Sequence, residues 1–316
     1  MSDTGKLSVI ISTYNRCESL KRVLNDLLEN RDADGWSHEV IVVDNNSADA
    51  TQQVVESYLE KFNSRLKYVY EPNQGLNFAR NRGLNESEGN VVAYTDDDVL
   101  VSKDWVSSIE ELFGEHDCDA VGGRVLPVFP ENSPWWAKKY LKILTGAILV
   151  HDYGEGAMHY DPGKMNQFVG ANMIFKKSIF ERCGNFNTDI GLGRGTIGDD
   201  TELFNRMRKQ GVEICYCGKI LIRHPVERHR MTLRFIAKWN KDLGKYFVVK
   251  EGSESDTDIV YYFKIPRYLI SRIGKNGLKL LGSVFNMGHF LKLWSMVFRD
   301  IGMVIQYHKE HKESHE

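Results

Sequence analysis

The sequence predicts an α/β fold in which a mostly parallel, twisted sheet is flanked by helices, with a helical extension at the C-terminus. The main observation is that short β-branched runs alternate with longer segments of helical periodicity over the first hundred residues, a pattern typical of βαβ units. The second observation is the composition. With 42% hydrophobic and 27% charged residues in a chain of 316, it indicates a globular protein of one large or two small domains.

The expected strands of the first half are short and rich in valine and isoleucine, and they cover residues 7–12, 40–44, 66–70 and 91–95. The helical stretches that follow them cover residues 18–30, 49–61, 76–87 and 104–114. After residue 121 the alternation loosens. There we expect strands at 168–176 and 219–222, and helices at 199–210, at 232–247 and in the C-terminal stretch.

The formal charge of −2 conceals a basic segment near the C-terminus. Residues 263–305 hold seven Lys and Arg residues against Asp300, a formal charge of +6, so the rest of the chain carries −8. Alternation of these cations with large apolar residues suits an amphipathic helix on an anionic membrane surface. The alternative is an extension that packs on the rest of the chain or on another subunit. Nucleic acid is not expected as a partner, because the chain is mildly acidic and has no recognised binding motif.

The N-terminus is polar and runs directly into a strand, and no stretch of 18 apolar residues occurs. These features predict a cytoplasmic protein whose contact with a membrane is peripheral. Five cysteines without a repeated spacing favour reduced thiols over a disulfide framework. Cys215 and Cys217 alternate on an expected strand and are predicted to be core residues.

Three consecutive aspartates, Asp96, Asp97 and Asp98, follow the apolar run 91–95. Alternate side chains of a strand share a face, so Asp96 and Asp98 are expected to point the same way about 6.5 Å apart. At an effective dielectric constant of about 20, their repulsion is roughly 2.5 kcal/mol. A hard divalent cation, Mg²⁺ or Mn²⁺, would relieve it and could be shared with substrate phosphates. The alternative is a solvated acidic turn.

Polar side chains follow the other expected strands as well. Thr13, Tyr14 and Arg16 come after the first strand, and Asp44 ends the second. In open sheets of parallel strands, ligands bind beyond the carboxyl ends, so these groups are expected to line one cleft. Residues 45–47 can also be read as a simple turn before the next helix.

A second acidic pair, Asp199 and Asp200, opens the helix predicted at 199–210. Gly193, Gly195 and Gly198 precede it with the spacing GxGxxG, but no strand leads into this loop, so the match to a dinucleotide site is weak. One aspartate of the pair can cap the helix. The other is then available to deprotonate a nucleophile while the triplet holds a cation on a phosphate leaving group.

Six segments together resemble family 2 glycosyltransferases. They are SVIISTYNR at 8–16, VVDNNSAD at 42–49, NQGLNFARNRGL at 73–84, YTDDDV at 94–99, GANMIF at 170–175 and GDDTELFNRM at 198–207. The resemblance covers roughly residues 6–250. It implies the GT-A fold and an inverting transfer of sugar from a nucleoside diphosphate donor. It also implies a catalytic domain over residues 1–250, with a nucleotide-binding half at about 1–100 and an acceptor half at about 101–250, followed by a basic amphipathic helical extension over 251–316.

The resemblance assigns the donor side of the site residue by residue. Thr13, Tyr14 and Arg16 match part of the nucleotide pocket, Asp44 matches the carboxylate that contacts the base, and Arg80 matches a basic residue that helps to hold the donor nucleotide. In the triplet, Asp98 matches the cation ligand and Asp96 lies nearer the nucleoside. Asp97, in the same donor motif, points to the opposite face.

The catalytic and acceptor residues are assigned in the same way. Asp200 matches the catalytic aspartate, and Asp199 stands where the family has glutamate. His224 is a candidate contact to the diphosphate or a third metal ligand, with a structural histidine as the alternative. Gly170 and Asn172, in the motif at 170–175, are the expected acceptor contacts. Trp135 and Trp136 suit stacking on sugar rings and suit a packed lid equally.

We therefore expect a metal-dependent transferase that builds a polysaccharide or a lipid-linked glycan, with a UDP-sugar as the donor favoured by family frequency. One alternative is a sugar nucleotidyltransferase, which would need a loop rich in Gly, Arg and Lys after the first strand where this chain has STYNR. The other is a scaffold that binds nucleotide sugars without turnover.

Overall fold

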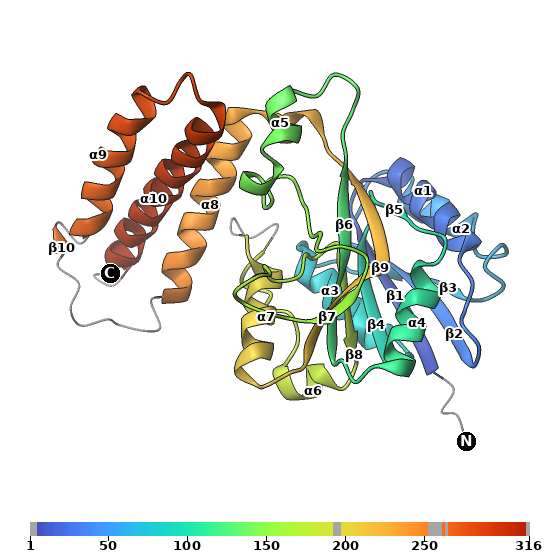
Figure 1. Cartoon of the computed structure of the whole chain (residues 1–316). Coiled ribbons are helices and arrows are strands. Elements are labelled where there is room, and N and C mark those ends of the chain that lie inside the picture. Colours follow the sequence, from blue (N-terminus) through green and yellow to red (C-terminus); the bar gives the residue numbers. More distant parts are fainter. Residues whose placement is uncertain (1–4, 192–196, 252–260, 263–264, 314–316) are drawn as a thin grey trace. The chain divides into compact units, whose positions relative to one another are not determined.

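The computed structural model describes residues 5–191, 197–251, 261–262 and 265–313. The chain divides into two compact units. The first unit comprises Met1–Val128, Leu149–Arg194 and Asp199–Pro225, and the second comprises Phe129–Ile148, Gly195–Gly198 and Val226–Glu316. Residues 226–250 thus pack with the C-terminal helices (Figure 1).

A mixed sheet forms the first unit, and its described strands run in the order β3-β2-β1-β4-β8-β6-β9-β5, with β7 beside β9. Neighbours in β3-β2-β1-β4 are parallel, β8 is antiparallel to both β4 and β6, and β6 is parallel to β9. The strands are β1 Gly5–Thr13, β2 Trp36–Asp44, β3 Leu66–Tyr70, β4 Val91–Asp96, β5 Leu100–Val101, β6 Ala120–Val128, β7 Ala157–His159, β8 Asn172–Lys176 and β9 Ile214–Pro225. The predicted α/β class is confirmed.

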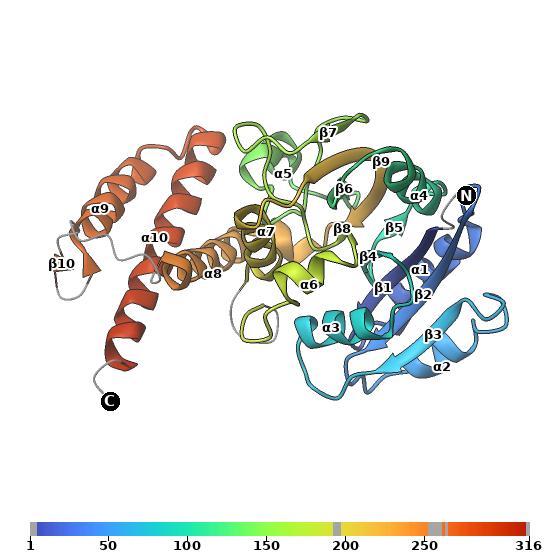
Figure 2. The same ribbon diagram turned by 90° about the horizontal axis from the view of Figure 1, so that it is seen from below.

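Helices cover both faces of this sheet, as the view from below shows (Figure 2). One face packs on α1 Cys17–Glu29, α2 Thr51–Glu56 and α4 Trp105–Glu115, and the other on α3 Leu76–Glu86, α6 Ile179–Cys183 and α7 Asp199–Lys209. Along β1, Val9 and Ile11 enter the first core and Ile10 enters the second. A strand buried on both faces is necessarily apolar throughout, which explains the continuous runs in the sequence. Each such side chain contributes about 1.5–3 kcal/mol by leaving water.

The second predicted helix is shorter than expected. The pattern indicated residues 49–61, but α2 spans Thr51–Glu56 and gives way to turns. Asn63 and Ser64 adopt positive φ angles of 48° and 68°. These two residues form the turn into β3, which begins at Leu66. Helix α2 itself ends earlier, because beyond Glu56 the amides of Tyr58 and Leu59 bond to carbonyls three residues back instead of four.

The expectation of reduced cysteines is wrong for two residues. Cys118 and Cys215 form a disulfide, with their Cα atoms 6.1 Å apart. The two positions are 97 residues apart in sequence, and the pairing of β6 with β9 brings them together. Cys215 and Cys217 are buried, as predicted.

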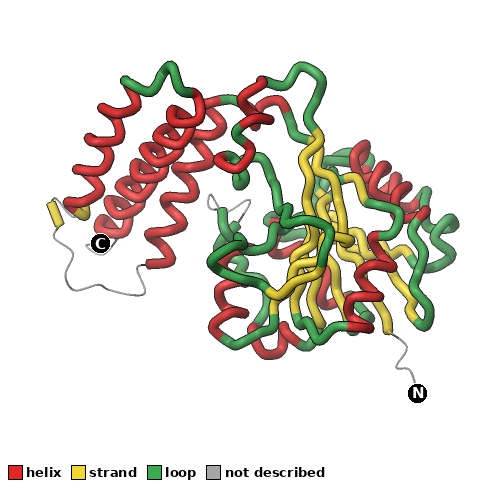
Figure 3. Tube along the Cα trace, viewed as in Figure 1, coloured by secondary structure: helices red, strands yellow, loops and turns green. Residues whose placement is uncertain are grey.

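The second unit is helical, and its three long helices lie side by side (Figure 3). Its elements are α5 Trp135–Lys139, η1 Leu141–Ile143, η2 Arg228–Met231, α8 Leu233–Glu251, β10 Tyr261–Tyr262, β11 Ile265–Pro266, α9 Arg267–Leu281 and α10 Met287–Glu313. Helices α8 and α10 approach closely at Gly244 and Gly302, where an added Cβ would meet a backbone oxygen of the other helix at 2.0 Å. Arg272 of α9 binds the fully buried Asp300 of α10 through two hydrogen bonds of 2.7 Å. The predicted C-terminal helices are confirmed.

Among the described helices, none combines the length and the apolar character needed to cross a bilayer.

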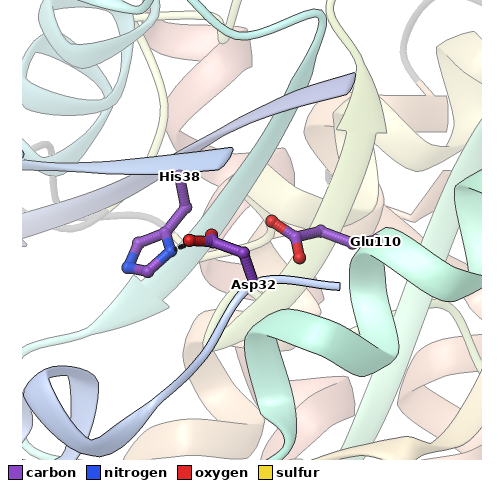
Figure 4. A group of neighbouring side chains, drawn as sticks. All are labelled: Asp32, His38 and Glu110. Carbon is purple, nitrogen blue, oxygen red and sulfur yellow. Dashed lines mark hydrogen bonds and ion pairs between the residues drawn. The ribbon is translucent and has the colours of Figure 1, made fainter. Parts of the chain in front are cut away.

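A polar cluster of the first unit contains the exposed Asp32 and the buried His38 and Glu110, whose possible metal-ligand atoms lie within 4.8 Å of one another (Figure 4). Arg65 Nη1 lies 2.8 Å from His38 Nε2. Because arginine only donates, Nε2 accepts, and the ring proton sits on Nδ1, which bonds to Asp32. The imidazole therefore has no lone pair left for a metal ion, and the neighbouring guanidinium disfavours a cation.

Within this cluster, Glu110 is the acidic residue that carries a proton. Glu110 is fully buried, and its Oε2 accepts a 2.6 Å hydrogen bond from the Ala33 amide. Burial, followed by the neighbouring Asp32 carboxylate, raises the pKa of Glu110 to about 8. Glu110 is thus protonated at neutral pH, which avoids a second negative charge beside Asp32.

Glu110→Gln is expected to flatten the pH dependence of stability. Since its pKa is raised in the folded state, Glu110 stabilises the fold at low pH and loses this contribution as pH rises through about 8. Thermal unfolding from about pH 6.5 to 9 should show a falling Tm for the wild type and a flatter curve for the variant, while the histidines, which titrate near pH 6.5, are common to both proteins. Glu111→Gln, at an exposed neighbour, is the matched control. Parallel curves for wild type and Glu110→Gln would contradict the assignment.

Candidate active site

The carboxyl ends of three parallel strands bring the predicted donor residues together. In the β1–β2 register Thr13 lies opposite Asp44, and in the β1–β4 register Ser12 lies opposite Asp96. Parallel strands that end at one level place their following loops at one edge of the sheet. The convergence expected from the sequence is therefore present.

Two hydrogen bonds join the loop after β1 to the loop after β2. Asn15 has a positive φ of 53°, its amide donates to Ser47 Oγ at 2.9 Å, and its Oδ1 accepts from the Ala48 amide at 2.7 Å. Thr13 is buried, whereas Tyr14 is 49% exposed. Tyr14 is thus open to solvent or to a ligand, as are its exposed neighbours Asn15 and Arg16.

Asp44 is buried and already has partners. Its Oδ1 accepts from the Ser47 amide at 2.8 Å, and its Oδ2 accepts from the Tyr68 hydroxyl at 2.8 Å. Burial, then the hydrogen bond to Asp44, raises the pKa of Tyr68 and keeps this phenol a donor. The carboxylate is therefore held in one orientation at the strand end.

Asn45 is a site residue that the sequence analysis did not single out. It is buried, its Oδ1 accepts from the Gly75 amide at 2.8 Å, and its Nδ2 donates to the Asn73 carbonyl at 2.7 Å. It therefore joins the loop after β2 to the start of α3. Its place directly after Asp44 in a polar strand end was the available signal.

The aspartate triplet divides into a buried residue, Asp97, and two half-buried residues, Asp96 and Asp98. Asp97 is 7% exposed, and burial raises its pKa to about 7. Arg16 forms an ion pair with Asp98 and lies 3.9 Å from Asp97 Oδ1. One guanidinium thus offsets part of the repulsion among the three carboxylates.

His224, at the end of β9, completes a group of metal-type ligands with Asp96 and Asp98. Donor atoms of the three residues lie within 4.8 Å of one another. His224 Nδ1 lies 3.0 Å from the Pro225 carbonyl oxygen, which only accepts, so Nδ1 carries the proton. Nε2 faces Asp98 Oδ1 at 3.4 Å, so the neutral imidazole would direct its lone pair toward a cation held by the two aspartates. Two carboxylates and an imidazole, oriented through its other nitrogen, are a ligand set that fits a divalent cation.

The second acidic pair is held by Arg80 from α3. Arg80 is 4% exposed and forms an ion pair with Asp199, while its Nη1 also lies 3.4 Å from Asn77 Oδ1. Gly170 lies against both groups: a Cβ there would meet Arg80 Nη2 at 2.6 Å and Asp200 Oδ2 at 3.7 Å. A residue larger than glycine would displace the guanidinium.

Asp200 is oriented by backbone amides. Its Oδ2 accepts from the Gly170 amide at 3.1 Å and its Oδ1 from the Thr201 amide at 2.8 Å. Burial, followed by repulsion from Asp199, raises the pKa of Asp200 to about 6, against the lowering effect of Arg80. A carboxylate with this pKa is ionised at neutral pH and remains a useful proton acceptor.

Two asparagines of α3 fix the loop that leads to α7, and the sequence analysis did not single them out. Asn77 Nδ2 donates to the carbonyls of Asn187 and Ile190 at 2.7 and 3.1 Å. Asn81 exchanges two hydrogen bonds with the backbone of Phe186, at 2.9 and 3.0 Å. The sequence shows only that both residues lie in the motif at 73–84, and it does not indicate the backbone groups between 186 and 190 to which they bond.

Asn172 differs from the expectation. It is fully buried, its Oδ1 accepts from Trp105 Nε1 at 3.0 Å, and its Nδ2 donates to the carbonyls of Arg124 and Ile220 at 3.1 and 2.9 Å. An amide with three protein partners and no exposed surface does not reach a substrate. We therefore assign Asn172 to the joining of β8, β6 and β9, in place of the acceptor contact.

The remaining predicted residues fall elsewhere in the chain. Trp135 and Trp136 begin α5 of the second unit, and Trp135 is 60% exposed. Gly193 and Gly195 lie outside the described residues. Gly198 has a φ of 102°, a backbone conformation that favours glycine.

Comparison with known proteins identifies relatives of this chain. The family model for glycosyl transferase family 2 matches residues 8–184. The succinoglycan biosynthesis protein ExoM of Rhizobium meliloti is 24% identical over 237 residues, which cover 75% of this chain and 72% of ExoM. Glycosyltransferase GlyA of Streptococcus pneumoniae is 24% identical over 74% of this chain, but the chain spans only 32% of GlyA.

Solved structures share the fold. The mannosyltransferase PcManGT from Pyrobaculum calidifontis, in complex with GDP-Man and Mn²⁺, matches with a TM-score of 0.64 at 17% identity, over 97% of this chain and 88% of PcManGT. Residues 1–349 of TarS from S. aureus, in complex with UDP-GlcNAc, match with a TM-score of 0.54 at 16% identity, over 96% of this chain and 92% of that one. The fold is therefore of the GT-A type.

Asn172→Ala is expected to destabilise the first unit by about 2–4 kcal/mol, because it leaves two carbonyls and an indole N–H buried without partners. Urea unfolding at neutral pH measures the change. Asn185→Ala, at an exposed position, should shift stability by no more than about 0.5 kcal/mol. Similar small effects of both substitutions would show that the Asn172 hydrogen bonds do not hold the strands.

Proposed function

Because this chain belongs to glycosyl transferase family 2, we propose that it moves a sugar from a nucleoside diphosphate donor to a hydroxyl group of an acceptor, with inversion at the anomeric carbon. The main support for this proposal is that two groups of acidic side chains lie at the same edge of the sheet. Asp96, Asp98 and His224 form the first group. Asp199 and Asp200 form the second, beside Gly170, which lies two residues before the strand that pairs with β4.

The first group forms the donor side. Asp44, with a carboxylate fixed by two hydrogen bonds, is assigned to the base, and Thr13 and Tyr14 to the nucleoside pocket. Arg16 lies against Asp97 and Asp98 and is assigned to the nucleotide. Asp96 is placed toward the nucleoside, and Asp97 supports the motif from the buried side.

Asp98 and His224, with Asp96 beside them, would hold Mg²⁺ or Mn²⁺. Bound there, the cation would neutralise the charge of the departing diphosphate. The Nε2 nitrogen of His224 and the carboxylate oxygens are the donor types that these ions accept. Arg16 must then release at least part of its contact with Asp98.

Asp200 is the proposed general base. It accepts the proton of the acceptor hydroxyl as that oxygen attacks the anomeric carbon, and the backbone amides of Gly170 and Thr201 hold its carboxylate in place. Asp199, ion-paired with Arg80, orients the start of α7. The contacts of Arg80 thus favour a positioning role in addition to the donor contact expected from the sequence.

We further propose a UDP-sugar as donor and a glycan or lipid-linked acceptor, with action at the cytoplasmic face of a membrane. UDP-GlcNAc in the TarS structure supports the choice of base, although PcManGT carries GDP-Man. The name of ExoM supports polysaccharide biosynthesis as the setting. Trp135 and Trp136 are proposed to stack on acceptor sugar rings.

Asp200→Asn should keep donor binding and lower turnover by a factor of about 10² to 10⁴, the usual contribution of a general base. Release of nucleoside diphosphate from UDP-, GDP- and dTDP-sugars measures turnover, and a thermal shift with the nucleotide measures binding. The wild-type rate should fall as pH drops below about 6, because the carboxylate must be ionised to accept a proton.

Asp189→Asn is the matched control, since Asp189 is exposed in the loop before α7. It should leave both the rate and its pH dependence unchanged. Turnover of Asp200→Asn close to that of the wild type would remove Asp200 from the role. Nucleotide binding by the wild type without any turnover would instead indicate a scaffold.

His224→Gln should raise the Mn²⁺ concentration needed for half-maximal donor hydrolysis by about tenfold or more, because a weaker ligand replaces the fixed imidazole. A titration of activity with Mn²⁺ at saturating donor measures the shift. His116→Gln, an exposed histidine of the same unit, should behave like the wild type. An unchanged metal requirement in His224→Gln would make His224 a structural residue.

A further inference from the structure

Large apolar side chains are exposed together where α9 ends and turns into α10. Leu278 and Leu281 are each 74% exposed, Val284 is 58% exposed and Phe285 is fully exposed. Two of them lie in the last turns of α9, and two lie in the short connection before Met287. We call these four residues the α9 tip.

The α9 tip is not the inner face of an amphipathic helix. Helix α9 turns Leu269 and Asn276 toward the rest of its unit, and Ser283 is buried just beyond its end. Ile270, Leu278 and Leu281 repeat at helical spacing on the side that remains exposed. An apolar stripe on the solvent side adds nothing to the core, so it calls for another partner.

Basic residues accompany the apolar ones. Arg267, Lys275 and Lys279 are exposed on α9, and residues 265–299 contain no Asp or Glu. The second unit as a whole has nineteen Lys and Arg against eleven Asp and Glu, a formal charge of +8. The expected partner is therefore negatively charged and offers an apolar layer.

We propose that the α9 tip inserts into the headgroup region of an anionic lipid surface, with Lys275 and Lys279 against the lipid phosphates. A bilayer meets both requirements, because its surface is anionic and its acyl layer takes up Leu and Phe side chains a few ångströms below. A second copy of the chain fits less well, since a symmetric contact would oppose the lysines of one α9 to those of the other. This inference goes beyond sugar transfer and does not depend on the donor site.

The aromatic residues at the other end of α9 agree with this placement. Tyr262 and Tyr268 are 51% and 42% exposed, and Arg267 lies 5.8 Å from the ring centre of Tyr262. Tyrosine is enriched at membrane interfaces, where its ring is apolar and its hydroxyl stays wet. The exposed side of α9 therefore presents interfacial side chains along its length.

The test is sedimentation of the full chain with vesicles, in the absence of any nucleotide sugar. One set contains phosphatidylcholine alone and the other also contains phosphatidylglycerol. Binding to the second set should be stronger and should weaken with added salt. Leu281→Ser with Phe285→Ser should weaken it by at least about tenfold. Lys275→Gln with Lys279→Gln should weaken it by about fivefold per lysine.

The matched control carries Leu59→Ser and Lys103→Gln, which remove an exposed leucine and an exposed lysine of the first unit. It should bind as the wild type does. Equal binding of all variants, or no preference for phosphatidylglycerol, would overturn the proposal. So would a dimer in analytical ultracentrifugation that is lost with Phe285→Ser, because a second copy would then cover the tip. Donor hydrolysis by each variant separates failure of this proposal from failure of the transferase assignment.

Discussion

Carboxylate repulsion at the carboxyl edge of the sheet is the constraint on which the site depends. Five aspartates, Asp96, Asp97, Asp98, Asp199 and Asp200, belong to two groups at this edge, and each group has one arginine against it. Arg16 faces the first group, and the buried Arg80 faces the second. Each arginine lowers the cost of holding like charges together without removing it. The negative charge that remains favours binding of a cation at the first group and uptake of a proton at the second.

The first unit contains two clusters of side chains that could bind a metal ion, and the two differ in the hydrogen bonds that their histidine makes. His224 donates a hydrogen bond from Nδ1 to the Pro225 carbonyl, so its Nε2 is directed toward Asp98. His38 accepts from Arg65 on Nε2 and bonds to Asp32 through Nδ1, which leaves neither nitrogen free. Both clusters contain two acidic side chains and an imidazole, yet only in the cluster of Asp96, Asp98 and His224 does a ring nitrogen face the position where a cation would bind.

Much of the fold could be predicted from sequence because its signals are local. The apolar runs of β1, β2 and β4 and the helical periods between them indicate βαβ units, and the polar residues after each strand indicate the edge where a ligand binds. The short α2 could not be predicted, because the helical pattern of residues 49–61 does not show that the amides of Tyr58 and Leu59 bond three residues back instead of four. Contacts between distant segments were equally hidden. Examples are the Cys118–Cys215 disulfide, the pairing of Arg80 with Asp199 and the burial of Asn172.

The central claim is that the strand-end site binds a nucleoside diphosphate together with a divalent cation. Thermal unfolding of the full chain with UDP, GDP or dTDP, each with and without Mn²⁺, tests it most directly, because ligand binding to the folded state raises the Tm. We expect a clear rise with one nucleotide, largest for UDP, that needs Mn²⁺ and disappears with EDTA. A rise of the same size without the cation, or none with any nucleotide, would contradict it.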